Sequence, residues 1–377
     1  MTARLLPLLR FFFFSLTFLR PTTSFHFDNV ATEMANMIVK SPLYGPISAR
    51  AKSTMIETAQ SAGIAWEDEL ERLENLCDWN DKLQLEMKHL PSSSSSFFPS
   101  YFKKPFHTYS DGNLGWLPAF EQRLGSAAVG VRNYPSLGSQ GETFFRGTFP
   151  EAVSRIVGTR FRDTVQGLVV DAGCGTGTSS ALLAEEYPSG QVLGIDASPF
   201  MIVVGRELLQ EDGYSERIKL VTRKMEDTKL EDSSADVYSI SLCLHECTAE
   251  ATKRILKEAR RVLKPNGILQ IMEMDGGSPG FEKLRKNPFL FSLIASTEPH
   301  LKEYFEEVNS RLPELLEGAG FARGSLTHAT SRHYALVASG RLRAGDKFEF
   351  QDERDLEFMS RSDEHMETMD KGRGVKG

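Results

Sequence analysis

The sequence Val169-Val170-Asp171-Ala172-Gly173-Cys174-Gly175-Thr176-Gly177 is the most informative stretch of this 377-residue chain. Apolar residues lead to an acid, and three glycines follow at every second position. This pattern is typical of a buried strand that ends in a tight turn before a helix. We expect that helix at about 179–186, with unpaired backbone N–H groups at its start, where a nucleotide-like ligand fits.

The spacing of the glycines indicates which nucleotide binds. A dinucleotide fingerprint needs its third glycine at the position of Thr178, and here Gly177 comes one residue early. No Gly-Lys-Ser/Thr follows, so the lysine of an ATP phosphate loop is missing. Asp171 places a negative charge beside the loop, which disfavours pyrophosphate and favours an ammonium group. S-adenosylmethionine (SAM) is therefore the expected cofactor, and an NAD-dependent enzyme is the weaker alternative.

Three segments resemble the class I SAM-dependent methyltransferases. Residues 171–177 resemble their motif I, 194–198 their second motif, and 261–269 the segment before their fifth strand. Asn266-Gly267 stands where the family usually has Gly-Gly, and this pair still permits the turn. The resemblance covers roughly 160–340 and is strongest to the methyltransferase-11 type, which includes quinone C-methyltransferases and their plastid and algal relatives.

The resemblance implies a Rossmann-like class I methyltransferase fold. This is an α/β fold with a seven-stranded, mostly parallel sheet, an antiparallel last strand and, here, a helical N-terminal extension. The alternation of strand and helix patterns supports it. Strands are expected at 167–171, 191–196, 218–222, 235–244, 267–274, 325–330 and 333–338, and helices at 200–209, 249–263 and 301–316.

Composition divides the chain into five regions. We expect a targeting presequence at 1–24, a helical extension at 25–90, a serine-rich linker at 91–100, a methyltransferase domain with an N-terminal lid segment at 101–340, and a disordered charged tail at 341–377. The helices of the extension either form a lid or pad the main domain. The aromatic residues of 101–149 either wall an apolar pocket or pack under a loop.

The amino terminus resembles a targeting signal. Its apolar residues at 5–9 and 11–19, divided by Arg10, form a stretch too short to span a bilayer comfortably. Thr22 and Ser24 precede a possible cut before Phe25. A cut before phenylalanine resembles the bipartite plastid presequences of algae with secondary plastids. Plastid delivery is the expectation and the secretory pathway the alternative, because the early acids Asp28 and Glu33 depart from the usual transit peptide.

Net charge and cysteine spacing indicate which kinds of partner and metal the chain does not bind. The net charge of −7 implies no broad basic surface, so we expect no nucleic-acid partner, and we expect no stable membrane span in the mature chain. Four scattered cysteines show no paired zinc spacing. Cys243, His245 and Cys247 lie close in sequence, but their segment is expected to run from strand into loop without a second ligand pair. No metal is predicted.

Parallel strands present their loops at the carboxyl edge of a sheet, where ligands bind. The resemblance assigns Asp171 to the methionine part of SAM and Asp196 to the ribose hydroxyls. A helix-cap role for Asp196 is the alternative, although Ser198 before Pro199 already suits that task. The full set of expected cofactor-binding residues is Asp171, Gly173, Cys174, Gly175, Gly177, Asp196, Ala197, Met225, Glu226 and Leu242.

His245 and Glu246 are the expected catalytic pair. His245 would deprotonate the acceptor while Glu246 orients it, or His245 merely packs over the cofactor. His107 and Tyr109 are further candidates, and the insert at 276–300 is expected to cap the substrate pocket. The predicted function is methyl transfer from SAM to a small-molecule acceptor. The alternatives are a quinone or prenyl-lipid C-methyltransferase and a non-catalytic SAM-binding assembly protein.

Overall fold

The structure, a computed structural model, describes residues 37, 41, 44–90, 97–107, 109–287, 291, 294 and 297–354. The predicted presequence at 1–24, residues 91–96 of the predicted linker and the tail beyond 354 lie outside the described residues. In the described part of the chain, no helix is both long and apolar enough to span a membrane. All four cysteines are free.

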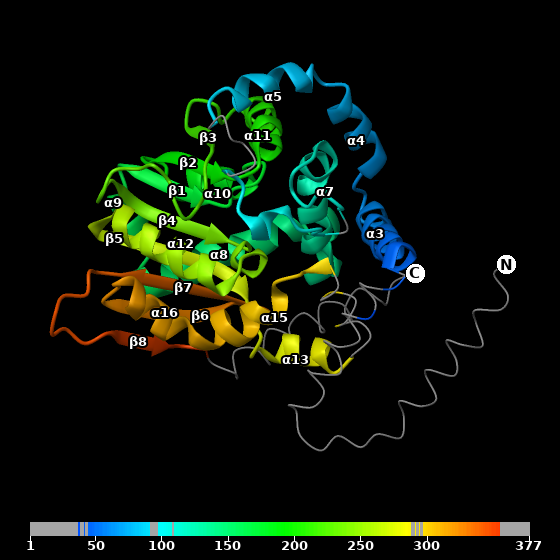
Figure 1. The fold of residues 1–377 in the computed structure, drawn as a ribbon. Helices are drawn as coiled ribbons and strands as arrows, with labels where there is room; N and C mark the ends of the chain where they lie inside the picture. The colour runs from blue at the N-terminus through cyan, green and yellow to red at the C-terminus, as the bar shows by residue number, and fades with distance from the viewer. Residues whose placement is uncertain are drawn as a thin grey trace, which may run out of the picture.

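An eight-stranded sheet in the order β3-β2-β1-β4-β5-β7-β6-β8 forms the centre of the molecule (Figure 1). Strands β1 to β5 pair in parallel, and β7 runs antiparallel to both β5 and β6. This confirms the mostly parallel α/β sheet. The strands are β1 (Leu168–Ala172), β2 (Gln191–Asp196), β3 (Ile218–Thr222), β4 (Ala235–Ser241), β5 (Leu263–Met274), β6 (Arg323–Thr330), β7 (His333–Ser339) and β8 (Glu349–Asp352).

The eighth strand corrects two expectations, the count of seven and the disorder of the tail from residue 341. Strand β8 pairs in parallel with β6. Phe350 packs over Gly324 of β6, where a Cβ atom would lie 2.9 Å from the ring. The charged composition of the tail hid Phe348 and Phe350, which supply the apolar contacts that hold this strand on the sheet.

Helices cover both faces of the sheet, as alternation along β1 requires. Val169 faces a core shared with α8 (Gly141–Val157), α10 (Thr178–Glu186) and α11 (Pro199–Glu211). Val170 faces a second core that includes α12 (Ala249–Val262) and α16 (Leu312–Ala319). The helix expected at 301–316 is broken into several short turns. These are α15 (Leu301–Glu303), η5 (Tyr304–Val308), η6 (Asn309–Arg311) and the start of α16.

The amino-terminal extension is helical, as predicted. Helices α3 (Tyr44–Ser61), α4 (Trp66–Glu74) and α5 (Trp79–Met87) form an arc beside α7 (Trp116–Asn133) and α11 (Figure 1). Leu73 and Trp79 are buried in a cluster with Phe120 of α7 and with residues of α11. The helices of the extension therefore pack against the main domain, which is the second of the two alternatives given for them.

The aromatic segment at 101–149 differs from expectation, because it contains most of two long helices, α7 and α8. Gly130 and Gly141 let these helices cross closely: a Cβ atom on Gly130 would lie 2.3 Å from the Cα of Glu142. Phe120 and Phe145 are core residues rather than walls of a pocket. The glycines needed at the crossing weakened the helical pattern in the sequence. Short turns η2 (Ser100–Lys103), η3 (Pro135–Gln140), α9 (Phe161–Thr164) and α13 (Pro279–Arg285) complete the main domain.

Candidate active site

Asp171, at the end of β1, is fully buried. Its Oδ2 accepts hydrogen bonds from Ser179 Oγ at 2.7 Å and Ser180 Oγ at 2.6 Å, both at the start of α10. Burial raises the pKa of Asp171, and the two serine hydroxyls oppose that rise. No described residue donates a hydrogen bond to the buried Oδ1 atom. This oxygen therefore retains acceptor capacity for a ligand.

The glycines of the loop all adopt positive φ angles, 77° at Gly173, 52° at Gly175 and 88° at Gly177. A Cβ atom on Gly173 would lie 2.4 Å from Cys243 Sγ, whereas one on Gly177 would lie 2.8 Å from Leu209 Cδ1. Gly177 thus makes room for core packing, which differs from the expected clearance for a ligand. The turn itself needs glycine because side chains rarely adopt such φ angles.

The thiol of Cys174 points into the core, and the backbone of Cys174 forms part of the glycine loop. Its side chain is buried against Gly194 of β2, where a Cβ atom would lie 2.9 Å from Cys174 Sγ. The backbone N–H groups of Gly173 and Cys174 both donate to the carbonyl of Ile195, at 2.8 and 3.1 Å. These bonds fasten the turn after β1 to the end of β2.

Asp196 joins the loops after β1 and β2. Its Oδ2 accepts from the backbone N–H of Gly175 at 3.0 Å, and its Oδ1 accepts from that of Ser198 at 2.7 Å. Ser198 Oγ caps α11 by accepting from Met201 N at 3.3 Å. Burial raises the pKa of Asp196 to about 6. Ala197 lies half-buried between these two residues.

The remaining expected cofactor residues follow β3 and β4. Met225 Sδ lies 3.9 Å from Cys243 Sγ, which places it beside the glycine loop. Glu226 Oε1 accepts from the Tyr101 hydroxyl at 2.8 Å. Leu242 adopts a φ of 52°, unusual for a side-chain-bearing residue, and its N–H donates to the Met272 carbonyl at 2.8 Å.

His245 lies in η4 (Leu244–Glu246), just after β4, with 7% of its surface exposed. Its Nδ1 lies 2.9 and 3.0 Å from the two carboxylate oxygens of Glu273, a fully buried residue of β5. Burial alone would lower the pKa of His245, but the Glu273 carboxylate outweighs it and raises the pKa to about 10. A raised pKa disfavours a role for this ring as a general base at neutral pH.

Glu246 does not take the orienting role that was expected of it. The residue that positions His245 is Glu273, and Glu246 instead accepts from Asn113 Nδ2 at 3.1 Å. Burial raises the pKa of Glu246 to about 7. Glu273 lies inside a buried strand, and an acid at such a position was the one signal in the sequence that marked it.

The segment before and within α7 reaches over the carboxyl edge of the sheet. Asn113 links the loops after β2 and β4, since its carbonyl accepts from Ser198 Oγ at 2.7 Å while its amide donates to Glu246. Gln122 Oε1 accepts from the backbone N–H of Thr176 at 3.1 Å and also from the Thr176 hydroxyl. Neither residue was among the expected site residues, because each acts through contacts distant in sequence.

His107 joins this edge and Tyr109 does not. The His107 N–H donates to the Thr297 carbonyl at 3.0 Å, and Nε2 lies 2.8 Å from Glu298 Oε1. Burial alone would lower the pKa of His107, but Glu298 raises it above the ordinary value. The Tyr109 hydroxyl donates to Glu121 at 2.5 Å, a contact outside the expected site.

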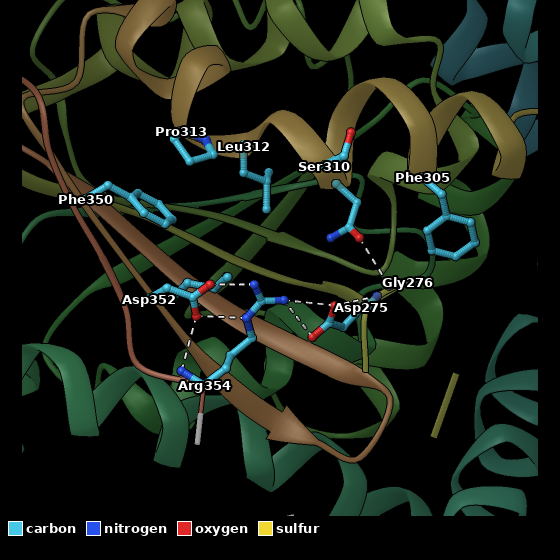
Figure 2. Close-up of a pocket in the computed structure, with 12 residues that line it drawn as sticks. Asp275, Gly276, Phe305, Ser310, Leu312, Pro313, Phe350, Asp352 and Arg354 are labelled. Atoms are coloured by element: carbon cyan, nitrogen blue, oxygen red, sulfur yellow. Dashed lines mark hydrogen bonds and ion pairs between the residues drawn. The ribbon is translucent and has the colours of Figure 1, made fainter. Parts of the chain in front are cut away.

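A separate cavity of about 480 Å³ lies between the η5–α16 segment and the strands near β8 (Figure 2). Figure 2 shows the Arg354 guanidinium between the carboxylates of Asp275 and Asp352. Both Asp275 oxygens lie 3.1 Å from Nη1 of Arg354. None of the residues predicted for cofactor or catalysis lines it. The cavity is therefore distinct from the carboxyl-edge cluster.

Comparison with known proteins finds similarity to methyltransferases. Residues 169–267 match a family described as a methyltransferase domain. A demethylmenaquinone methyltransferase from Listeria welshimeri is 29% identical over 167 residues, which cover 41% of this chain and 70% of the relative. A ubiquinone/menaquinone biosynthesis C-methyltransferase from Vibrio vulnificus is 27% identical over 183 residues, which cover 45% of this chain and 69% of the relative.

Among solved structures, a SAM-dependent methyltransferase from Aquifex aeolicus aligns with a TM-score of 0.39 and 22% sequence identity. The alignment covers 50% of this chain and 88% of that one.

Proposed function

This chain is a class I SAM-dependent methyltransferase, and we propose that it methylates a small aromatic acceptor bearing a hydroxyl group, of the quinol type. The two relatives are named as methyltransferases of menaquinone and ubiquinone biosynthesis, which supports this class of acceptor. The observation that carries the proposal is that a histidine and a carboxylate, His245 and Glu246, are neighbours in the short turn after β4. Both are groups that interact with an acidic hydroxyl.

We propose that the loops after β1 to β3 hold the cofactor. SAM supplies a methyl group on a positively charged sulfur. The buried, unpartnered Oδ1 of Asp171 fits the ammonium-bearing end, directly or through water. Asp196 uses its carboxylate for two backbone N–H groups and keeps further lone pairs for ribose hydroxyls. The remaining members of this proposed set are Gly173, Cys174, Gly175, Gly177, Ala197, Met225, Glu226 and Leu242.

The acceptor would lie where β4 and β5 end. Glu246 takes the hydroxyl proton, because its pKa of about 7 matches a base that works near neutral pH. His245, held in place by Glu273, stabilises the negative charge of the oxygen anion that results. The segment from Tyr101 to Gln122 acts as a lid that excludes water from this edge. Deprotonation makes the oxygen, or the ring carbon activated by it, the nucleophile.

Methyl transfer to defined acceptors tests this proposal. The full chain is incubated with methyl-labelled SAM and either a demethylated prenyl naphthoquinol, kept reduced, or a water-soluble amine. We expect label in the quinol, and mass spectrometry locates the methyl group. Label in the amine alone, or no transfer to either acceptor by a chain that binds SAM, would contradict the quinol proposal.

A matched pair of variants tests the role of Glu246. Glu246→Gln should lower kcat by about 100-fold because it removes the proposed base. The control is Glu250→Gln, which makes the same change on the exposed surface of α12 and should leave kcat unchanged. Equal kcat values for the two variants would remove Glu246 from this role.

We also propose plastid delivery, based on the apolar run and the possible cut before Phe25. Residues 1–43 fused to a fluorescent protein should enter the plastid of an alga with a secondary plastid. Fluorescence confined to the secretory pathway would favour the alternative.

A further inference from the structure

We propose that His107, His245 and Glu298 together bind a divalent transition-metal ion, best matched by Zn²⁺. One ligand atom from each of the three residues lies within 4.8 Å of the others. The three residues come from distant segments: the one before α7, the turn after β4 and the insert after β5. The ion would therefore lie at the carboxyl edge of the sheet, on the side proposed for the acceptor.

The environment of His245 is typical of a metal-binding imidazole. Its Nδ1 contacts the buried Glu273 carboxylate at 2.9 Å, which leaves Nε2 as the nitrogen available to a cation. Histidines that bind metals commonly donate their other ring N–H to a carboxylate, which fixes the ring and raises its basicity. Glu273 thus supplies the supporting contact that a His245–metal bond would need.

Glu298 provides an independent indication of a cation site. Its side chain is only 11% exposed, and its Oε1 lies 2.8 Å from Nε2 of His107. The other oxygen, Oε2, is buried and has no hydrogen-bond partner among the described residues. A buried carboxylate oxygen without a partner is costly, and a metal ion would satisfy it.

The charge of the cluster also favours a cation. Three carboxylates, those of Glu246, Glu273 and Glu298, interact with the ring of His245. A cation bound at this cluster would balance that negative charge. The side chain of His107 is 44% exposed, so an ion has a route from solvent.

The donor set selects the ion. Two imidazole nitrogens and one carboxylate oxygen suit Zn²⁺ and related transition metals, whereas Mg²⁺ prefers oxygen ligands only. Three protein ligands leave a fourth tetrahedral position for water or for an acceptor oxygen. The ligand spacing along the chain gave no sign of this site, because metal motifs are recognised from ligands close in sequence.

Zinc binding by the full chain, stripped with a chelator, tests the proposal. We expect one equivalent of Zn²⁺ by titration calorimetry and by elemental analysis after gel filtration, with no comparable binding of Mg²⁺. His107→Asn and Glu298→Gln should each abolish this stoichiometric binding. Asparagine is chosen because His107 has a φ of 47°, a conformation that asparagine tolerates. Glu273→Gln, which acts through His245, should weaken binding by about 10- to 100-fold.

Two controls keep the outcome clear. His89→Ala and Glu306→Gln change exposed residues outside the cluster and should retain one bound Zn²⁺. SAM binding reports that each variant is folded, and it is expected to persist in both His107→Asn and Glu298→Gln. Folded wild type without bound zinc, or zinc binding unchanged in both ligand variants, would overturn the proposal, as would a preference for Mg²⁺.

Discussion

The two halves of the carboxyl edge are built in different ways. In the half proposed to bind SAM, the loops after β1, β2 and β3 (the cofactor half), Asp171 and Asp196 are held by the nearby serines Ser179, Ser180 and Ser198. Glu226 is the exception, because it accepts from the distant Tyr101. In the acceptor half, the loops after β4 and β5, His245 pairs with Glu273 and His107 with Glu298. A short motif can therefore specify the first half, whereas the second depends on how distant segments meet.

The two halves also balance charge differently. Backbone N–H groups and serine hydroxyls stabilise the acids of the cofactor half, and these groups are present wherever the turn forms. The acids of the acceptor half are balanced by imidazoles from other segments. If either segment moves, the acid loses its partner. We expect the cofactor half to respond mainly to changes of backbone shape, and the acceptor half to changes of charge.

The largest effect is expected from Gly173→Ala. Its left-handed φ and the overlap with Cys243 Sγ should together destabilise the folded chain by about 3 kcal/mol or more and abolish SAM binding. Gly213→Ala is the matched control, because Gly213 has a φ of 81° but nothing within 4 Å of an added Cβ atom. It should lose about 1 kcal/mol by denaturant unfolding and keep SAM affinity. Equal losses would mean that backbone strain alone matters.

Glu273→Gln tests the charge dependence of the acceptor half. Neutralising a buried partner of His245 should lower the free energy of unfolding by about 3 kcal/mol, while SAM affinity changes little. Glu282→Gln makes the same change at an exposed position of α13 and should stay within about 0.5 kcal/mol. If both variants unfold at the same denaturant concentration, the proposed difference between the halves is wrong.

Asp196→Asn sharpens the comparison within the cofactor half. Loss of a charged acceptor should weaken SAM binding by about 1.5–3 kcal/mol at neutral pH, measured by calorimetry. The wild type should also lose affinity as the pH falls through about 6, where Asp196 gains a proton, and the variant should not. Asp236→Asn serves as the control. Asp236 lies at the amino-terminal end of β4, away from the carboxyl edge of the sheet, and this variant should bind SAM like the wild type.

The raised pKa of Asp196 also sets the sign of its effect on folding. Between its ordinary pKa of 3.8 and about 6, the folded chain holds more protons than the unfolded chain. The contribution of Asp196 to stability therefore falls as the pH rises through this window. Comparing unfolding of the wild type and Asp196→Asn across that range measures it, and parallel curves would argue against the shift.

The smallest effect is expected from Gln122→Ala. Gln122 is one of the long-range contacts of the cofactor half, and its loss removes the hydrogen bonds that hold Thr176 of the glycine loop. We expect SAM binding to weaken by about 1 kcal/mol, with faster hydrogen exchange at 174–177. Gln210→Ala, on the exposed side of α11, should change neither measurement. A loss as large as that of Asp196→Asn would show that the cofactor half is not local after all.

The sequence predicts several elements with the same first and last residues that the structure has. The strands expected at 191–196 and 218–222 match β2 and β3, because apolar periodicity is a local property. Helices α7 and α8 were missed because Gly130 and Gly141 serve a crossing that only packing reveals. Strand β8 was missed because two phenylalanines were outweighed by the charges around them.

The sequence by itself determined the strand, turn and helix at 169–186, the α/β class of the sheet and SAM as the cofactor. Each of these depends on the spacing or charge of residues that are neighbours along the chain. Only the tertiary structure decided which groups surround His245 and Glu298, and that Gln122 and Asn113 reach the loops. Such contacts arise where parallel strands end together, and the chain order does not record which side chains meet there.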